Sequence, residues 1–429
     1  MKYIRLAGAS LNQTPLDFNG NKRNIINAIE EAKAQGVSLL CLPELGISGY
    51  GCEDAFFSDY IIERSLESLE EIAEACEDIT VSVGLPMVYE HCLYNVVCLI
   101  HNKEVQGFVA KQELAGDGIY YEPRWFKRWV EQKRVDYTWK GVTYPFGDLL
   151  FEIDTVRIGF EICEDAWNGI RPAQRHYRHN VDVILNPSAS NFALGKSEVR
   201  KSLVTETSRS YSCTYVYSNL LGNESGRIIF DGEILISQEG KLLARNQRLG
   251  FSDFQVVSTV VDIDRVTLYR KKSFNFEPET PPHLIEIEGI IPEAMPEKAV
   301  EVPNIEDWET EFYLAETLGL FDYMRKSWSR GFVLSLSGGA DSSCCAVLIA
   351  KSFERAEKEL GRERFLEKIA YTGIDLDIPI AQQLFTCVYQ ATANSGGETL
   401  QSAEELAKGL GATFYHWDVE PLHKEYKGL

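Results

Sequence analysis

A cysteine in an acidic setting lies in the stretch FEICEDAW at 160–167. Cys163 has Glu161 two residues before it, and Glu164 and Asp165 directly after it. Nearby negative charges raise the pKa of a thiol, whereas the thiolate is the nucleophilic form. Cys163 is therefore either an ordinary buried thiol or a nucleophile whose base and positive charge come from elsewhere in the chain.

Three polar residues of this chain follow apolar runs that read as β-strands. Glu44 lies in CLPELGISGY, Lys111 in FVAKQELAGDG and Cys163 in GFEICEDAW. At strand ends the three could share one pocket. The carboxylate would take the thiol proton, and the ammonium would stabilise the oxyanion formed when a thiolate attacks a carbonyl. Taken singly, each has a plainer explanation, namely a buried inert thiol or solvated surface.

The elements that would position these residues alternate along residues 3–264. Two stretches have the spacing of amphipathic helices, at 21–36 and 66–78. Strands are predicted at 3–10, 37–44, 79–90, 93–102, 104–111, 156–163, 181–190 and 213–222. This alternation predicts an α/β sandwich, with functional residues where strands end.

The composition changes between residues 277 and 303, where six of the fifteen prolines fall among acidic residues. We interpret 266–304 as an extended, solvated linker between a first domain at 1–265 and a second at 305–429. In the second, a helix at 305–327, a strand at 331–336, a strand at 367–377 and a helix and strand within 402–417 predict a Rossmann-like α/β unit. Its strands are too few for a doubly wound core, so we expect this domain to be incomplete in the chain.

Bulk composition narrows the class of protein. The 429 residues are 45% hydrophobic and 25% charged, as in globular proteins. The net charge of −21 argues against non-specific nucleic-acid binding. The ten cysteines form no C-x-x-C pair, no apolar stretch is long enough for a membrane span, and the N-terminus does not read as a signal peptide. We therefore expect a cytoplasmic protein with reduced thiols.

The first domain resembles the nitrilase superfamily, through P-E-L at 43–45, K-x-x-L at 111–114 and C-E-D at 163–165. The resemblance implies an αββα sandwich whose Glu-Lys-Cys triad hydrolyses carbon–nitrogen bonds. It implies that Glu44 is the general base, Lys111 stabilises the tetrahedral intermediate and Cys163 is the nucleophile. Glu122, in YEPRWF, matches a second glutamate that helps to position the site.

The segment NPSASNFALGKSEVR is similar to the glutamine-binding stretch of the glutaminase branch. The resemblance implies that Ser190 and Lys196 hold the amino-acid end of glutamine, with Tyr50 and Glu164 as further contacts. The chain departs from some relatives at Asp117, where they carry a tyrosine in the loop after the lysine.

A second candidate site is SLSGGADSS at 335–343, between a predicted strand and a helix. Glycines let backbone amides approach a phosphate and serines add donors, although a simple glycine-rich turn is the alternative. No G-K-[ST] follows, which excludes a Walker A loop. The pattern S-G-G-x-D-S resembles the PP-loop of ATP pyrophosphatases, which implies ATP contacts at Ser335, Leu336, Ser337, Gly338, Gly339, Ala340, Asp341, Ser342 and Ser343, with Asp341 as a magnesium ligand.

The two halves together resemble the family of glutamine-dependent NAD synthetases. The resemblance implies that ammonia from glutamine amidates ATP-adenylated deamido-NAD, with ATP and Mg²⁺ as co-substrate and ion, no tightly bound organic cofactor and a closed homo-oligomer. Because most ammonia is protonated at neutral pH and is then not a nucleophile, we also expect a shielded passage for it between the domains. Two alternatives stay open: a glutaminase that feeds a different PP-loop amidating ligase, and a non-catalytic scaffold with a degenerate triad.

Four further residues invite functional interpretations. Cys344 and Cys345 are adjacent, but we interpret them as small apolar residues on the helix after the phosphate loop. His176 and His179, in RHYRHN, are expected on a solvated surface. No sequence pattern of metal ligands stands out.

Overall fold

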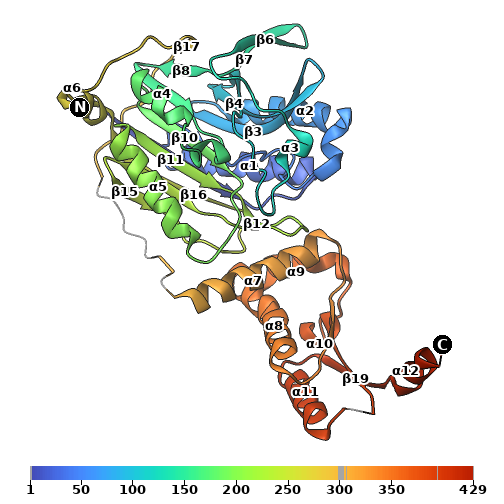
Figure 1. Ribbon diagram of the computed structural model, residues 1–429. Coiled ribbons are helices and arrows are strands. Elements are labelled where there is room, and N and C mark those ends of the chain that lie inside the picture. Colours follow the sequence, from blue (N-terminus) through green and yellow to red (C-terminus); the bar gives the residue numbers. More distant parts are fainter. Residues whose placement is uncertain (1, 298–303, 306, 394, 429) are drawn as a thin grey trace. The chain divides into compact units, whose positions relative to one another are not determined.

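The computed structural model describes residues 2–297, 304–305, 307–393 and 395–428, and the chain divides into two compact units, Met1–Glu306 and Asp307–Leu429. Each unit is described by itself (Figure 1). No helix among the described residues has the length and apolar character that crossing a membrane requires.

The first unit contains a large mixed sheet. The strand pairs β1–β2, β2–β3 and β5–β7 are parallel, and the others are antiparallel. Its spatial order is β16 (Phe254–Asp262), β1 (Tyr3–Leu11), β2 (Leu39–Cys41), β3 (Thr80–Tyr89), β4 (Cys92–His101), β5 (Glu104–Ala110), β7 (Val142–Gly147) and β6 (Arg134–Trp139).

A second sheet of the same unit contains β9, the strand before Cys163. Its spatial order is β15 (Lys241–Arg245), β14 (Ile234–Gln238), β11 (Thr214–Asn219), β10 (Val183–Ser188), β9 (Val156–Phe160), β8 (Leu150–Ile153) and β17 (Leu284–Ile287). A short antiparallel ribbon pairs β12 (Leu221–Asn223) with β13 (Ile229–Asp231).

Helices cover the outer faces of both sheets (Figure 1). α1 (Phe18–Ala34) and α2 (Asp59–Ala75) pack on the larger sheet, and α4 (Pro172–Arg178) and α5 (Lys196–Ser210) on the other. α1 begins where the Asp17 carboxylate accepts the Gly20 N–H at 2.9 Å, and it ends before Gly36, whose φ is +71°. The remaining helical segments are η1 (Glu53–Phe57), α3 (Glu122–Trp125), η2 (Cys163–Ala166) and α6 (Ile263–Lys272).

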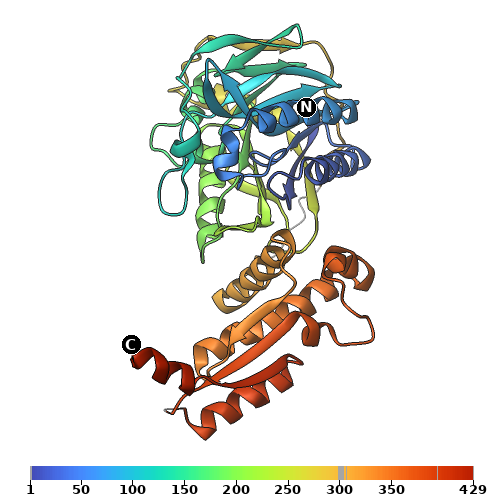
Figure 2. The ribbon, with the colours of Figure 1, turned by 90° about the vertical axis from the view of Figure 1, so that its right-hand side faces the viewer.

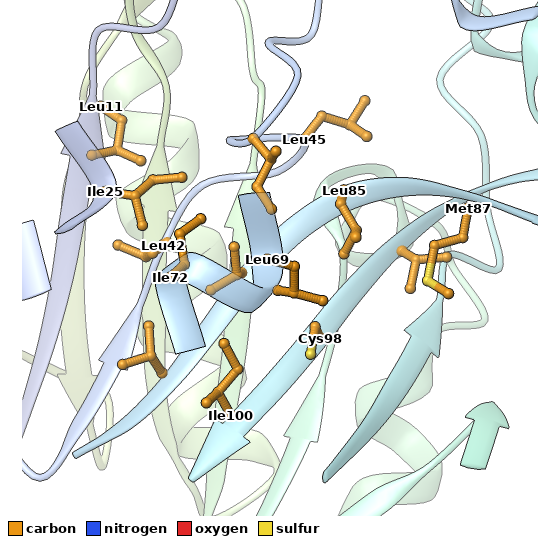
Figure 3. Close-up of a cluster of buried hydrophobic side chains, with 14 of the residues drawn as sticks. Leu11, Ile25, Leu42, Leu45, Leu69, Ile72, Leu85, Met87, Cys98 and Ile100 are labelled. Carbon is orange, nitrogen blue, oxygen red and sulfur yellow. The ribbon is translucent and has the colours of Figure 1, made fainter. Parts of the chain in front are cut away.

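Three apolar layers hold this sandwich together. One lies between α1, α2 and the larger sheet, and Figure 3 shows Ile25, Leu69, Ile72 and Leu85 from these elements side by side. The middle layer joins the two sheets, and the third lies under α4 and α5. The predicted αββα fold of the first domain is confirmed, and both sheets end in turns that carry the candidate residues.

The second unit is built on a parallel sheet in the order β18 (Phe332–Ser335), β19 (Phe385–Ala391) and β20 (Thr413–Asp418). The helices α8 (Ala340–Leu360) and α11 (Gly397–Gly409) contact this sheet (Figure 2). The other helical segments are α7 (Trp308–Lys326), α9 (Arg362–Ile369), η3 (Ala370–Thr372), α10 (Ile380–Leu384) and α12 (Glu420–Lys427). The predicted α/β class of this unit is confirmed.

The strand predicted at 367–377 is wrong. Residues up to Ile369 belong to α9, which buries Phe365 and Ile369 on one face, and the chain then turns through η3 to Gly373 in the left-handed conformation. The strand is β19, whose aromatic and β-branched residues in FTCVYQA favour extended backbone.

The predicted linker also differs from an extended, solvated segment. α6 spans its start, and β17 adds to the sheet in parallel beside β8. The strand β17 contains the apolar residues Leu284, Ile285 and Ile287. Proline-rich stretches flank it, and their composition led to the prediction of an extended linker. Residues 298–303 lie outside the described residues, and the boundaries at 265 and 305 stay predictions.

Candidate active site and phosphate loop

Lys111 forms the centre of a buried ion cluster at the end of β5. Its ammonium Nζ lies 2.6 Å from Glu44 Oε1 and 2.8 Å from both carboxylate oxygens of Glu122. The three side chains are 0–1% exposed. Burial by itself lowers the pKa of Lys111, but the carboxylates of Glu122 and Glu44 raise it well above its usual range. Lys111 is therefore a fixed positive charge shielded from water.

Glu44, directly after the β2 region, has one committed oxygen and one open oxygen. Its Oε1 accepts from Lys111 and from Asn95 Nδ2, the latter at 2.7 Å. Within the described residues, its buried Oε2 has no hydrogen-bond partner. Burial raises the pKa of Glu44 to about 7, with Lys111 opposing the rise and Glu122 adding to it. A carboxylate with such a pKa and a free oxygen can accept and return a proton near neutral pH.

Cys163 begins a tight turn after β9. Its φ is +45°, in the left-handed region that residues with a side chain rarely adopt, and its thiol is buried. Burial and the Glu44 charge raise the pKa of Cys163, whereas Lys111 and a backbone hydrogen bond from Ala189 lower it. The charges of Glu44 and Lys111 thus both act on the sulfur.

Two of the three acidic neighbours of Cys163, Glu161 and Asp165, are engaged with other partners. Glu161 forms a buried ion pair with Arg171, whose nitrogens lie 2.8–2.9 Å from its oxygens. Asp165 accepts three backbone N–H groups, and Glu164 is half-buried. Sequence reasoning missed Asn95, Arg171 and the role of Asp165, because no local pattern signals such long-range partners.

The residues predicted to bind glutamine lie in the same unit. Tyr50 donates its hydroxyl to Glu122 Oε1 at 2.7 Å. Ser190 follows β10 and is buried. The side-chain amide of Asn219 accepts the Ser190 N–H and donates to the Ser190 carbonyl oxygen. Lys196 opens α5, and its Nζ lies 2.5 Å from Asn191 Oδ1. A cation at this helix end is electrostatically unfavourable, a feature typical of functional positions.

A tyrosine missed in the sequence reaches this site from the loop after the lysine. The hydroxyl of Tyr120 lies 3.0 Å from Asn191 Oδ1 and 3.1 Å from Ala189 O, and it accepts the Asn191 N–H. The sequence was expected to depart from some relatives because it has Asp117 where they carry a tyrosine. The same loop supplies a tyrosine three residues later, at Tyr120. The aromatic pair Tyr50–Tyr120, with ring centroids 6.1 Å apart, lines a cavity of about 240 Å³, and the Tyr50 hydroxyl links its wall to Glu122 of the ion cluster.

In the second unit the phosphate loop joins β18 to α8. Gly338 has φ +78°, and a Cβ there would meet Thr399 O at 2.2 Å. Ser337 Oγ lies 3.0 Å from Ser342 Oγ, and Ser343 Oγ donates to Gly339 O at 2.8 Å. A cavity of about 320 Å³ adjoins the loop, lined by residues that include Ser335, Leu336 and Ser337. Ala340 and Asp341 form the first turn of α8.

The remaining predictions can also be placed. The described residues contain no group of three or more His, Cys, Asp or Glu side chains that could hold a metal ion, and Asp341 therefore belongs to no such group. Cys344 and Cys345 lie on α8 and are exposed, and all ten cysteines are free.

The expectation that His176 and His179 are solvated is wrong. Both are buried, because α4 packs on β9, and His176 Nε2 lies 2.9 Å from Phe160 O. Burial lowers the pKa of both histidines.

Comparison with known proteins assigns a family to each of the two units. The carbon-nitrogen hydrolase family matches residues 5–271, and the NAD synthase family matches residues 313–429. The first unit is thus a carbon-nitrogen hydrolase domain. A solved glutamine-dependent NAD(+) synthetase from Cytophaga hutchinsonii is 45% identical, with a TM-score of 0.82, over 99% of this chain and 67% of that one.

Curated relatives give the same assignment. The putative glutamine-dependent NAD(+) synthetase of Schizosaccharomyces pombe is 30% identical over 97% of this chain, and the Homo sapiens glutamine-dependent NAD(+) synthetase is 28% identical over 99%. The chain spans 64% of the length of each. The chain belongs to the family of glutamine-dependent NAD(+) synthetases.

Proposed function

We propose that this protein hydrolyses glutamine at Cys163 and uses the ammonia to convert ATP-adenylated deamido-NAD to NAD, as a carbon–nitrogen ligase. The observation that carries the proposal is the buried cluster in which Lys111 joins Glu44 and Glu122, with Cys163 within reach of their charges. The family matches of both units support the link from glutamine hydrolysis to NAD synthesis.

The first half-reaction uses Glu44 as a proton carrier. Its open oxygen takes the thiol proton while the sulfur attacks the amide carbon of glutamine, and Lys111 stabilises the oxyanion. The carbon–nitrogen bond then breaks, and the leaving nitrogen takes the proton from Glu44 to form ammonia. Water attacks the thioester, Glu44 accepts its proton, and glutamate departs as that proton returns to the sulfur.

Glutamine recognition is assigned to Tyr50 and to polar residues that follow β9 and β10. Tyr50 lines the cavity and donates its hydroxyl to Glu122. Ser190, Lys196 and Glu164 are the polar groups proposed for the amino-acid end of glutamine. Tyr120 joins them, because its hydroxyl meets the loop that holds Ser190.

The second half-reaction is assigned to residues 335–343. Exposed N–H and hydroxyl groups of this loop would bind the pyrophosphate of ATP, with the adjoining cavity beside them. A magnesium ion would enter with ATP, bound mainly by its phosphates, and Asp341 would add one carboxylate. Adenylation of the nicotinate carboxylate releases pyrophosphate, and attack by ammonia releases AMP and gives NAD.

The test measures glutamate, NAD and pyrophosphate together. We expect glutamine-driven NAD formation that depends on ATP and deamido-NAD, with close to one NAD per glutamine hydrolysed. Loss of most of the ammonia to solution would contradict a shielded passage. Pyrophosphate release with a different acceptor acid, but not with deamido-NAD, would favour another PP-loop ligase. We further propose that the protein is cytoplasmic and forms a homo-oligomer. A measurement of its mass in solution tests the oligomeric state.

A further inference from the structure

The carboxylate of Asp165 joins the lysine turn, residues 111–113, to the cysteine turn, residues 162–166. Its Oδ1 accepts the backbone N–H of Gln112 at 3.1 Å and of Glu113 at 2.7 Å. Its Oδ2 accepts the N–H of Ile162 at 2.9 Å. One buried carboxylate thus holds the residues directly after the lysine and directly before the nucleophile.

The two turns belong to different sheets. The lysine turn follows β5 of the eight-stranded sheet, and the cysteine turn follows β9 of the seven-stranded sheet. Between the sheets lie apolar side chains such as Leu99, Phe151 and Ile158. Apolar packing is non-directional, whereas hydrogen bonds to a carboxylate fix both distance and angle. The cross-sheet geometry of the site therefore needs directional contacts such as those of Asp165.

The other contacts of Lys111 leave this cross-sheet geometry open. Its partner Glu44 follows β2 and is bonded by Asn95 of β4, and its partner Glu122 begins α3, which follows β5. All three strands belong to the eight-stranded sheet. They fix the ammonium within that half of the site. Arg175 also bonds the lysine turn, but through the flexible side chain of Gln112 and not its backbone.

We infer that Asp165 is a positioning residue that sets the distance between the Lys111 ammonium and the Cys163 sulfur. The inference rests on the proposed glutamine hydrolysis. Because both oxygens of Asp165 are bonded to backbone N–H groups, its effect is on position and not on proton transfer. A displaced ammonium stabilises the oxyanion less, and this interaction forms only as the reaction proceeds, so kcat falls while KM is kept.

The experiment replaces Asp165→Asn and measures the kinetics of glutamine hydrolysis. The amide has the same shape, but its NH₂ group cannot accept an N–H, so one of the two turns is released. We expect kcat to fall about 100-fold, the cost of a displacement near 1 Å, with KM for glutamine close to that of the unaltered protein.

Asp182→Asn is the matched control. Asp182 is also buried, accepts the Arg157 N–H at 3.0 Å and pairs with Arg270 at 2.9 Å. It lies directly before the first residue of β10, at the other end of that strand from Ser190. This variant should lose comparable thermal stability and keep kcat. If Asp165→Asn gives no folded protein, Asp165→Glu, which shifts the carboxylate by one methylene, should show the same loss of kcat.

Four outcomes separate the possibilities. A folded Asp165→Asn or Asp165→Glu variant with unaltered kcat overturns the inference alone, and so does an equal loss of kcat in Asp182→Asn. A rise in KM with kcat kept overturns it as well. An unaltered protein that hydrolyses no glutamine contradicts the proposed function itself.

Discussion

In the carbon-nitrogen hydrolase unit the charged groups of the site are buried, whereas in the second unit the phosphate loop is largely exposed. Lys111 bonds both Glu44 and Glu122, and the three side chains are 0–1% exposed. In the loop, Ser337 and Ser342 bond one another at the surface. A site that makes and breaks covalent bonds benefits from fixed charges in a dry environment, since water weakens their effect. A loop that binds phosphate instead needs N–H groups that stay available.

The strongest test of this comparison is Cys163→Ala. If the two sites are separate devices, glutamine hydrolysis should fall by about 10⁴-fold or more, as when a member of a catalytic triad is removed. NAD synthesis driven by added ammonium salt should be kept. Parallel assays with glutamine and with ammonium chloride check this, and loss of both activities would contradict the separation.

The next test removes the buried positive charge through Lys111→Met. Two buried carboxylates then lose their positively charged partner, so we expect the free energy of unfolding to fall by about 3–5 kcal/mol. The control is Lys140→Met, which breaks the exposed pair with Glu70 and should cost less than about 1 kcal/mol. Denaturant titration measures both, and equal effects would contradict the importance of burial.

The phosphate loop is tested by Gly338→Ala with Gly373→Ala as its control. Both glycines are left-handed, with φ of +78° and +69°, so each alanine costs about 1–2 kcal/mol. Only at Gly338 would the new Cβ meet another residue, Thr399 O at 2.2 Å. We expect ATP-dependent pyrophosphate release to fall at least about tenfold for Gly338→Ala beyond the control, equivalent to 1.4 kcal/mol. Similar activity in both variants would argue against a tight loop.

The last expected effect is a pH dependence confined to the first unit. Burial raises the pKa of Glu44 to about 7. A general base acts when ionised, so kcat/KM for glutamine hydrolysis should rise with pH up to about 7 and level off above it. Below that, the loss should approach about tenfold per pH unit. Ammonia-driven synthesis, corrected for the fraction of free ammonia, should not show this step. A flat profile of glutamine hydrolysis between pH 5 and 8 would contradict the assignment.

Sequence reasoning reached the parts of this chain that depend on local patterns. Apolar runs located the strands before Glu44, Lys111 and Cys163, and the structure brings Glu44 and Lys111 into contact. The predicted α/β classes of both units are confirmed. The roles of the site residues stay predictions that the variants above test.

The misses concern contacts made over long sequence distances. Asp165 meets a turn more than 50 residues earlier, and Tyr120 meets Asn191. We expected His176 at the surface because its sequence neighbours are polar, but α4 packs on β9 so that the His176 ring lies against Gly159. Such pairings depend on how two sheets stack, a property that no short window of sequence contains.

The strand β17 also bears on how the first unit could be isolated. It lies beside β8, whose residues Leu150, Phe151 and Ile153 are buried. A protein cut after residue 265 would leave β8 as an unpaired apolar edge, which is a template for intermolecular pairing. Such a fragment should aggregate, whereas one that continues to residue 297 should stay dispersed, although both contain every residue of the triad.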